Sequence, residues 1–187
     1  MINFRKARFV TSAPSLKEKP KDEKPAILFI GRSNVGKSTL INTLTSQKIA
    51  FSSKKAGKTK MLNYFDIDDR FYLVDAPGYG STIYANISTI NFAKMMESYV
   101  KERSLKGIVL LLDLRHELGE DDVAFLNYLK NCGKPLLYVI TKCDQMNQSS
   151  LSAAKRLAGK YGVLDPIYSF GDLKSLEPLK GRIEKCL

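Results

Sequence analysis

The sequence predicts an α/β fold of three layers, in which helices cover both faces of a mostly parallel six-stranded sheet with one antiparallel edge strand. The chain has 187 residues, 44% of them hydrophobic, which suffices for one domain with a buried core. Short apolar runs alternate with longer segments of helical periodicity, an order typical of parallel strands joined by crossover helices. The run at 26–30 is apolar throughout and ends at Gly31, as expected of a strand buried on both faces.

The chain divides into a basic lead segment, residues 1–25, and a domain, residues 26–187. Lysine and proline dominate 14–25 without apolar periodicity, so this stretch is expected to be exposed and irregular. Phe4, Phe9 and Val10, which precede it, could pair as an edge strand or dock on the surface. In the domain, strands are expected at 26–30, 61–66, 71–75, 108–113, 135–141 and 166–169, and helices at 36–46, 88–103, 121–131, 149–161 and 173–186.

The composition argues against several classes of protein. The three cysteines are odd in number and far apart, and His116 is the only histidine, so we expect free thiols in a reducing cytosol rather than a zinc cluster or a cysteine nucleophile. The N-terminus lacks the apolar core of a signal peptide, and the longest apolar run, 108–112, is far shorter than the ~20 residues of a membrane span. We therefore expect a cytoplasmic protein that does not enter a membrane.

Residues 31–38 fit the pattern G-x-x-x-x-G-K-[ST] and lie directly after a buried strand and at the start of a helix, where its chemistry requires. In such a P-loop, backbone N–H groups surround the β-phosphate of a nucleotide and the helix N-terminus adds positive charge. Lys37 would bridge the β- and γ-phosphates, and the Ser38 hydroxyl would be a ligand of Mg²⁺. A glycine-rich turn that merely caps a helix is the alternative interpretation. The predicted phosphate-binding loop is Gly31, Arg32, Ser33, Asn34, Val35, Gly36, Lys37 and Ser38.

Thr141, Lys142, Cys143 and Asp144 follow an apolar strand, and so reach the same edge of the sheet as the P-loop. A carboxylate at Asp144 can accept both N1–H and the exocyclic amine of guanine, a donor pair that adenine lacks. An adenine nucleotide would leave that carboxylate unpaired, at a cost of ~1–3 kcal/mol or more. Lys142 can lay its aliphatic stem along the base, whereas Cys143 is expected to be a packing residue.

Asp75, Ala76, Pro77 and Gly78 end the strand 71–75. The aspartate could hold Mg²⁺ through water and the Gly78 N–H could meet the γ-phosphate, so hydrolysis would release the loop that follows. A plain Pro-Gly turn is the alternative. Many small GTPases carry a glutamine after this glycine to orient the attacking water, but this chain has Tyr79, which predicts slow intrinsic hydrolysis.

The polar, lysine-rich stretch 47–60 is expected to be a loop that contains Gly57, Lys58, Thr59 and Lys60. Thr59 could complete the Mg²⁺ shell and sense the γ-phosphate. In the P-loop, the side-chain carbonyl of Asn34 could hold K⁺ beside the phosphates, as in potassium-activated GTPases that carry an asparagine at this place.

Together these motifs resemble the EngB family of GTP-binding proteins, also called YihA or YsxC. The similarity covers about residue 9 to the C-terminus and includes Gly-Lys-Thr at 57–59, Asp-Ala-Pro-Gly-Tyr-Gly at 75–80 and Asp-Leu-Arg-His at 113–116. The resemblance implies a Mg²⁺-dependent P-loop GTPase of the translation-factor-related class. It further implies that this GTPase assists assembly of the large (50S) ribosomal subunit, is linked to cell division and septation, and binds nucleotide also through Met61.

The chain departs from the family pattern at two places. Ala56 stands where members usually have proline. The last base-contacting loop, usually Ser-Ser or Ser-Ala, here contains Tyr168, Ser169 and Phe170. Ser169 is the match, and its backbone N–H is expected to contact the guanine carbonyl.

The formal net charge of +11 favours a polyanionic partner. A basic loop that GTP reorders would suit an RNA clamp, with steeply salt-dependent binding through the RNA backbone. Solvated charged faces are the alternative interpretation. The basic residues form two clusters. The switch-loop cluster, in the loop 47–60 that GTP would reorder, is Lys48, Lys54, Lys55, Lys58 and Lys60. The lead-segment cluster is Arg5, Lys6, Arg8, Lys17, Lys19, Lys21 and Lys24.

The sequence thus predicts a slow, Mg²⁺-dependent GTP hydrolase that binds GTP and GDP, gates association with a precursor of the large ribosomal subunit, and acts as a monomer. Catalysis is expected to be electrostatic, through Lys37, Thr59 and Gly78, without a side-chain general base. One alternative is a binding module that loads GTP without useful turnover. Another is a P-loop kinase for a small molecule, against which Asp144 argues.

Overall fold

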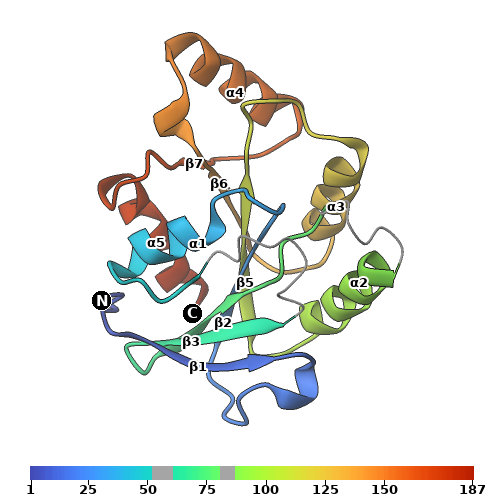
Figure 1. Cartoon of the computed structure of the whole chain (residues 1–187), viewed down its shortest axis with the longest axis vertical. Helices are drawn as coiled ribbons and strands as arrows, with labels where there is room; N and C mark the ends of the chain where they lie inside the picture. The colour runs from blue at the N-terminus through green and yellow to red at the C-terminus, as the bar shows by residue number, and fades with distance from the viewer. Residues whose placement is uncertain (52–60, 81–86) are drawn as a thin grey trace.

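Seven strands form one sheet in the order β1-β3-β4-β2-β5-β6-β7 (Figure 1). The computed structural model describes residues 1–51, 61–80 and 87–187, with the backbone alone for 87–91. Strands β4, β2, β5, β6 and β7 are mutually parallel, and β3 runs antiparallel to both of its neighbours. The strands are β1 (Ala7–Ala13), β2 (Ala26–Gly31), β3 (Leu62–Ile67), β4 (Phe71–Asp75), β5 (Leu105–Leu112), β6 (Leu136–Ile140) and β7 (Ile167–Tyr168).

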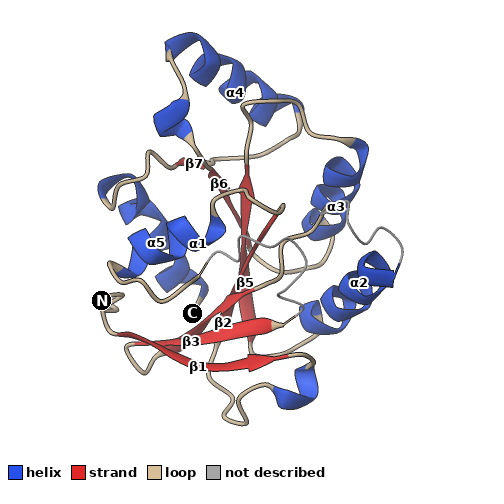
Figure 2. Cartoon of the chain, viewed as in Figure 1, coloured by secondary structure: helices blue, strands red, loops and turns tan. Residues whose placement is uncertain are grey.

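Helices cover both faces of this sheet, which confirms the predicted three-layer α/β fold (Figure 2). Helices α1 and α5 pack on one face, while α2, α3 and α4 pack on the other. The α-helices are α1 (Lys37–Thr45), α2 (Ile87–Val100), α3 (Glu120–Lys130), α4 (Gln148–Lys160) and α5 (Glu177–Cys186). Short 3₁₀ turns are η1 (Leu16–Glu18), η3 (Cys143–Gln145) and η4 (Lys174–Leu176).

Strand β2 shows how the sequence sets these layers. All six of its residues are buried, and successive side chains point to opposite faces of the sheet. Ile27 and Phe29 therefore join the core under α1 and α5, while Leu28 and Ile30 join the core under α2 and α3. None of the helices in the described part of the chain combines the length and hydrophobicity needed to span a bilayer.

The number of strands differs from the prediction. Six strands with the antiparallel one at the edge were expected, but β1 adds a seventh and covers the outer side of β3. Phe9 pairs with Phe65 across this contact, and their rings meet edge to face with centroids 5.8 Å apart. The edge pairing that Phe9 and Val10 suggested is therefore confirmed, and the antiparallel strand lies one position inside the edge.

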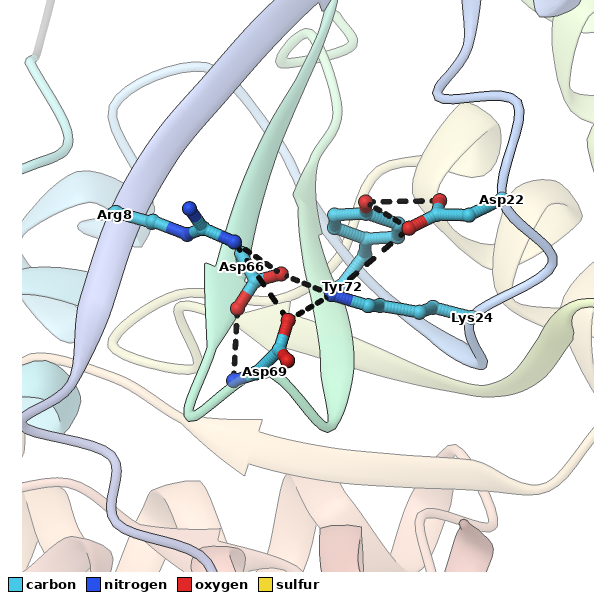
Figure 3. A network of polar contacts seen from close by, with 6 residues as sticks. All are labelled: Arg8, Asp22, Lys24, Asp66, Asp69 and Tyr72. Atoms are coloured by element: carbon cyan, nitrogen blue, oxygen red, sulfur yellow. Dashed lines mark hydrogen bonds and ion pairs between the residues drawn. The ribbon is translucent and has the colours of Figure 1, made fainter.

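A network of charged side chains fixes the lead segment to the β3–β4 hairpin (Figure 3). Its centre is Asp66, which is 2% exposed and accepts a hydrogen bond from the Lys24 ammonium at 2.6 Å. Lys24 also pairs with Asp69 at the hairpin turn, and these bonds to Asp66 and Asp69 raise the pKa of Lys24. The Tyr72 hydroxyl donates to Asp22 at 2.9 Å. The end of the lead segment is therefore tied to the sheet, since Asp22 and Lys24 have partners on β3, β4 and the turn between them.

Candidate nucleotide site

The P-loop leaves the carboxyl end of β2 and enters α1 as its motif predicts. Gly36, the residue before the helix, has φ of 101°, a left-handed conformation that glycine adopts without steric cost. The backbone N–H groups of the first turn of α1 have no intrahelical acceptor, so they point outward from the loop as donors. This geometry provides a cradle for an anion, reinforced by the positive end of the helix dipole.

Lys37, the first residue of α1, forms an ion pair with Asp75 at the end of β4. The two side chains are only 12% and 9% exposed, so both charges are largely withdrawn from water. Burial raises the pKa of the Asp75 carboxyl, against the opposing pull of the Lys37 ammonium and a hydrogen bond from Asn63. The structure therefore brings the predicted phosphate-binding lysine and the predicted metal-associated aspartate into direct contact.

The segment from Ala76 to Tyr79 packs closely on the P-loop. A Cβ on Gly78 would lie 2.9 Å from the Ser33 Cα, so only glycine fits there. The Ser33 N–H donates to the Tyr79 carbonyl at 2.9 Å, and the Tyr79 N–H donates to the Gly31 carbonyl at 3.2 Å. The backbone of residues 76–79 thus lies against the loop that would hold the phosphates.

The side chain of Tyr79 turns toward α2 and α3. Its ring centroid lies 4.6 Å from that of Phe125 and 6.2 Å from that of Phe92. Burial, together with the nearby carboxylate of Asp122, raises the pKa of the Tyr79 hydroxyl. The Tyr79 side chain thus lies in an aromatic cluster against α2 and α3, and slow intrinsic hydrolysis stays a prediction.

The Thr141–Asp144 loop leaves β6 at the same edge of the sheet and contacts the P-loop. The Thr141 hydroxyl donates to the Val35 carbonyl at 2.7 Å. Cys143 is 1% exposed, and burial raises its thiol pKa to about 11, so it is the expected packing residue. Asp144 is exposed. The Asp144 carboxylate, which is predicted to bind guanine, is therefore exposed to solvent on a loop that contacts the P-loop.

Lys142 is held by an ion pair with Asp113 that the sequence did not predict; Asp113, Arg115 and Lys142 together are called the Asp113 brace. Its backbone is left-handed, with φ of 59°, and its ammonium lies 3.0 Å from a carboxylate oxygen of Asp113 at the end of β5. The Arg115 guanidinium donates two further hydrogen bonds to this carboxylate, at 2.9 and 2.8 Å, and another to Gln145 at 2.6 Å. Burial would raise the pKa of Asp113, but the hydrogen bonds from Arg115 and Lys142 prevail and lower it to about 2.

Residues 168–171 lie beside Asp144, as the resemblance implied. An added Cβ on Gly171 would sit 3.9 Å from the Asp144 Cγ, and the Cys143 N–H donates to the Ser169 carbonyl at 3.1 Å. The Ser169 N–H, however, donates to Ile140 at 2.8 Å, and the Phe170 N–H donates to the Ser175 hydroxyl at 3.1 Å. The expected donor of Ser169 is thus already paired, because β7 extends through this residue by one more hydrogen bond to β6.

Part of the predicted site lies outside the described residues. This part is Gly57, Lys58, Thr59 and Lys60, so the expected ligand of Mg²⁺ at Thr59 stays a prediction. Met61 is exposed. In the described ranges, no three His, Cys, Asp or Glu side chains gather as an all-protein metal cluster. The oxygen donors Ser38 and Asp75 nevertheless suit Mg²⁺, which binds through a few protein oxygens, phosphates and water.

The structure describes the lead-segment cluster of basic residues but only part of the switch-loop cluster. Lys54, Lys55, Lys58 and Lys60 of the switch-loop cluster lie outside the described residues. In the lead-segment cluster several cations are neutralised by ion pairs with acidic neighbours, namely Lys6 with Asp68, Arg8 with Asp66 and Asp69, Lys19 with Glu102, and Lys24 with Asp66 and Asp69. Local charge balance therefore weakens the lead segment as an RNA-binding surface.

The comparisons with known proteins agree with this geometry. Residues 26–142 match a family model described as a 50S ribosome-binding GTPase. A protein of Lactobacillus gasseri named "Probable GTP-binding protein EngB" is 42% identical over 154 residues, which are 81% of this chain and 79% of that protein.

Two solved structures are similar to most of this chain. A crystal structure of a protein titled "probable GTP-binding protein engB" has a TM-score of 0.62 and 25% sequence identity, covering 86% of this chain and 97% of that one. The structure of Era from Aquifex aeolicus bound to GDP·AlF4⁻ has a TM-score of 0.66 and 25% identity, covering 87% of this chain and 56% of Era.

Proposed function

Because this chain belongs to the EngB family of GTP-binding proteins, we propose that its GTP hydrolysis operates a switch in assembly of the large ribosomal subunit. Its membership confirms the resemblance drawn from the motifs, and the protein is a P-loop GTPase. We further propose which residues bind the nucleotide and Mg²⁺, which ribosomal particle is the partner, and where in the cell the protein acts.

The observation that carries the proposal is the hydrogen bond from Thr141 to the Val35 carbonyl, because it joins the base-reading loop to the P-loop in one site. The phosphates would lie on the N–H groups of 34 and 36–38, since the N–H groups of Ser33 and Val35 donate to the Tyr79 and Arg32 carbonyls. Guanine would bind Asp144, with the stem of Lys142 along its face. A further base contact would come from residues 168–171, which lie beside the same carboxylate.

Hydrolysis would depend mainly on charge. A triphosphate competes with Asp75 for the Lys37 ammonium, which then neutralises charge on the β- and γ-phosphates. Mg²⁺, when bound, supplies further neutralisation, and the residues that would hold it are Ser38, Thr59 and, through water, Asp75. The Gly78 N–H would donate to the γ-phosphate. Because Tyr79 is packed among aromatic rings, no side chain of this segment activates the water, and turnover is slow.

The partner would be a precursor of the large subunit, contacted through rRNA backbone and ribosomal proteins. The net charge of +11 supports an RNA partner, and the family model that matches residues 26–142 is described as ribosome-binding. We propose that the protein works as a monomer in the cytoplasm. A link to cell division and septation would then follow from the supply of ribosomes.

Sedimentation with large-subunit particles tests the switch. The protein is loaded with a non-hydrolysable GTP analogue, with GDP or with no nucleotide, and centrifuged with the particles. Retention with the analogue alone is the expected result, and it should fall steeply as salt is raised. Equal retention in all three samples would contradict a switch. The Lys37→Ala variant, which loses a phosphate contact, should lose the dependence on the analogue.

Two further measurements separate the alternatives. Single-turnover hydrolysis with and without particles distinguishes a GTPase switch from a module that only loads GTP. The Asp144→Asn variant tests the base contact, because an amide offers xanthine the donor that its additional carbonyl needs. Preference shifting from guanine to xanthine nucleotides is expected, and an unchanged preference would favour a P-loop kinase that reads its nucleotide elsewhere.

A further inference from the structure

Asp122, in the first turn of α3, is a buried carboxylate with partners from two other segments. It is 5% exposed, whereas its neighbours Glu120 and Asp121 are exposed. Its Oδ2 accepts a hydrogen bond from the P-loop residue Arg32 at 2.7 Å and one from the Gly119 N–H at 3.2 Å. An acidic residue that only stabilised the helix N-terminus would need just the second contact, and it could remain in water as Asp121 does.

Tyr79 is the third residue near this carboxylate: its ring packs on Phe125 of the same helix, and burial together with the Asp122 charge raises the pKa of its hydroxyl. Tyr79 follows Gly78 directly, and its backbone is hydrogen-bonded on both sides to the P-loop. Gly80 adds to the contact, since a Cβ there would lie 3.3 Å from the Arg32 Nε. Asp122 therefore faces two segments at once: the loop that would hold the phosphates and the segment that would sense the γ-phosphate.

We propose that Asp122 is a positioning residue for recognition of the γ-phosphate, acting through Arg32 and Tyr79 to hold Gly78 at a fixed place against the P-loop. The inference rests on the proposed role of the Gly78 N–H. A donor already in place loses little freedom when it binds, so its positioning strengthens the bond to the γ-phosphate. GDP lacks this phosphate, and its affinity should not depend on the contact.

The test compares Asp122→Asn with Asp121→Asn, a matched change at an exposed carboxylate in the same helical turn. Affinities for GDP and for a non-hydrolysable GTP analogue are measured by calorimetry on the full chain. We expect Asp122→Asn to weaken the analogue roughly 5–30-fold, less than the factor of about 10–100 that one charged hydrogen bond supports because Asp122 acts indirectly, with GDP affinity within about twofold of wild type. Asp121→Asn should resemble wild type for both nucleotides.

A second variant covers the case in which Asp122→Asn does not fold. Tyr79→Phe keeps the ring in its aromatic cluster and removes only the hydroxyl that faces Asp122, so the analogue should again weaken relative to GDP. In a double-mutant cycle the two changes should not add, because both break one contact.

Three outcomes overturn the inference. They are an unchanged affinity ratio in both variants, an equal loss for both nucleotides, and additive effects in the cycle. The proposed function fails in a different way, since in that case the wild-type chain itself would show no nucleotide-dependent binding to large-subunit particles.

Discussion

The side chain of Thr141 and the backbone of Val35 are 106 positions apart in sequence, yet the Thr141 hydroxyl donates to the Val35 carbonyl at 2.7 Å. This hydroxyl also lies 3.3 Å from the Leu112 carbonyl, so it links the ends of β5 and β6 to the P-loop. The Leu112 carbonyl also accepts the Thr141 N–H at 2.9 Å, so the hydroxyl matters most for the Val35 carbonyl. A residue that reads as part of a base-binding motif is therefore also a structural joint of the site.

Replacing Thr141 by valine tests this joint. Thr141→Val keeps the shape and leaves the Val35 carbonyl without its donor, so we expect a loss of about 1–3 kcal/mol in the free energy of unfolding. Affinity for GDP should fall as well, because the two loops are no longer held together. Urea unfolding and calorimetry measure these effects. Thr141→Ser retains the hydroxyl and should lie closer to wild type. A valine variant with unchanged GDP affinity would contradict the role.

Asp113→Asn should weaken all guanine nucleotides by a similar factor. The change removes the charge that holds the Lys142 ammonium and Arg115, so Lys142 loses its fixed place beside the base. We expect affinities for GDP and for a GTP analogue to fall together by roughly 3–10-fold, less than a directly lost charged contact would cost because Lys142 itself remains. Glu117→Gln, an exposed carboxylate nearby, is the control. An effect on the analogue alone would place Asp113 at the γ-phosphate instead.

The lowered pKa of Asp113 makes the stability of the fold depend on pH. Asp113 has its pKa lowered to about 2, below the value of ~3.9 in an unfolded chain, so its contribution to stability is complete above ~4 and is lost as pH falls toward 2. Carboxyl NMR titration of wild type should show the Asp113 carboxyl still ionised at pH 3, and the resonance is assigned by its absence from Asp113→Asn. A titration of this group near 4 would contradict the brace.

Lys37→Met should destabilise the nucleotide-free protein most at high pH. Burial raises the pKa of Asp75, and Lys37 is the cation that opposes this effect. Without Lys37 the carboxylate is buried and unpaired, a change that typically costs ~3–5 kcal/mol. Protonation removes the charge, so stability should recover as pH is lowered through the raised pKa of Asp75. Chemical unfolding at several pH values measures this, and the double variant Lys37→Met/Asp75→Asn should lack the dependence.

Asn34 is the residue to change when testing activation by K⁺. Its φ of 65° is a left-handed conformation that glycine adopts without strain and alanine does not. Asn34→Gly therefore removes the side-chain carbonyl and leaves the backbone unstrained. We expect wild-type hydrolysis to be faster in KCl than in NaCl, and the variant to show no difference between the salts. Both are assayed with and without large-subunit particles. Equal wild-type rates in the two salts under both conditions would exclude a K⁺ site.

Much of the site could be predicted because its motifs are contiguous and each follows a buried strand. The apolar run 26–30 fixes where β2 ends, and the residues after it must lie at the carboxyl edge of the sheet. The ends of β4 and β6 meet the same edge for the same reason. Pattern and topology together therefore locate Lys37, Asp75 and Asp144 without any knowledge of side-chain contacts.

What the sequence did not predict depends on contacts between distant positions. Asp122 reads as one of several acids at a helix start, where the dipole alone explains it, and only the structure shows Arg32 beside it, 90 positions away. The roles of Asp113 and Lys24 are hidden for the same reason. The paired N–H of Ser169 was also missed, because the length of β7 depends on its neighbour β6 rather than on its own composition.

The position of β1 has a consequence for handling the protein. By pairing along β3, it occupies backbone groups that would otherwise form an open sheet edge. Truncation of the first 13 residues would uncover that edge together with the Phe65 ring, and such surfaces promote self-association. An N-terminal deletion designed to remove positive charge would therefore be expected to aggregate, and single substitutions at Arg5 or Lys17 are the safer way to reduce charge there.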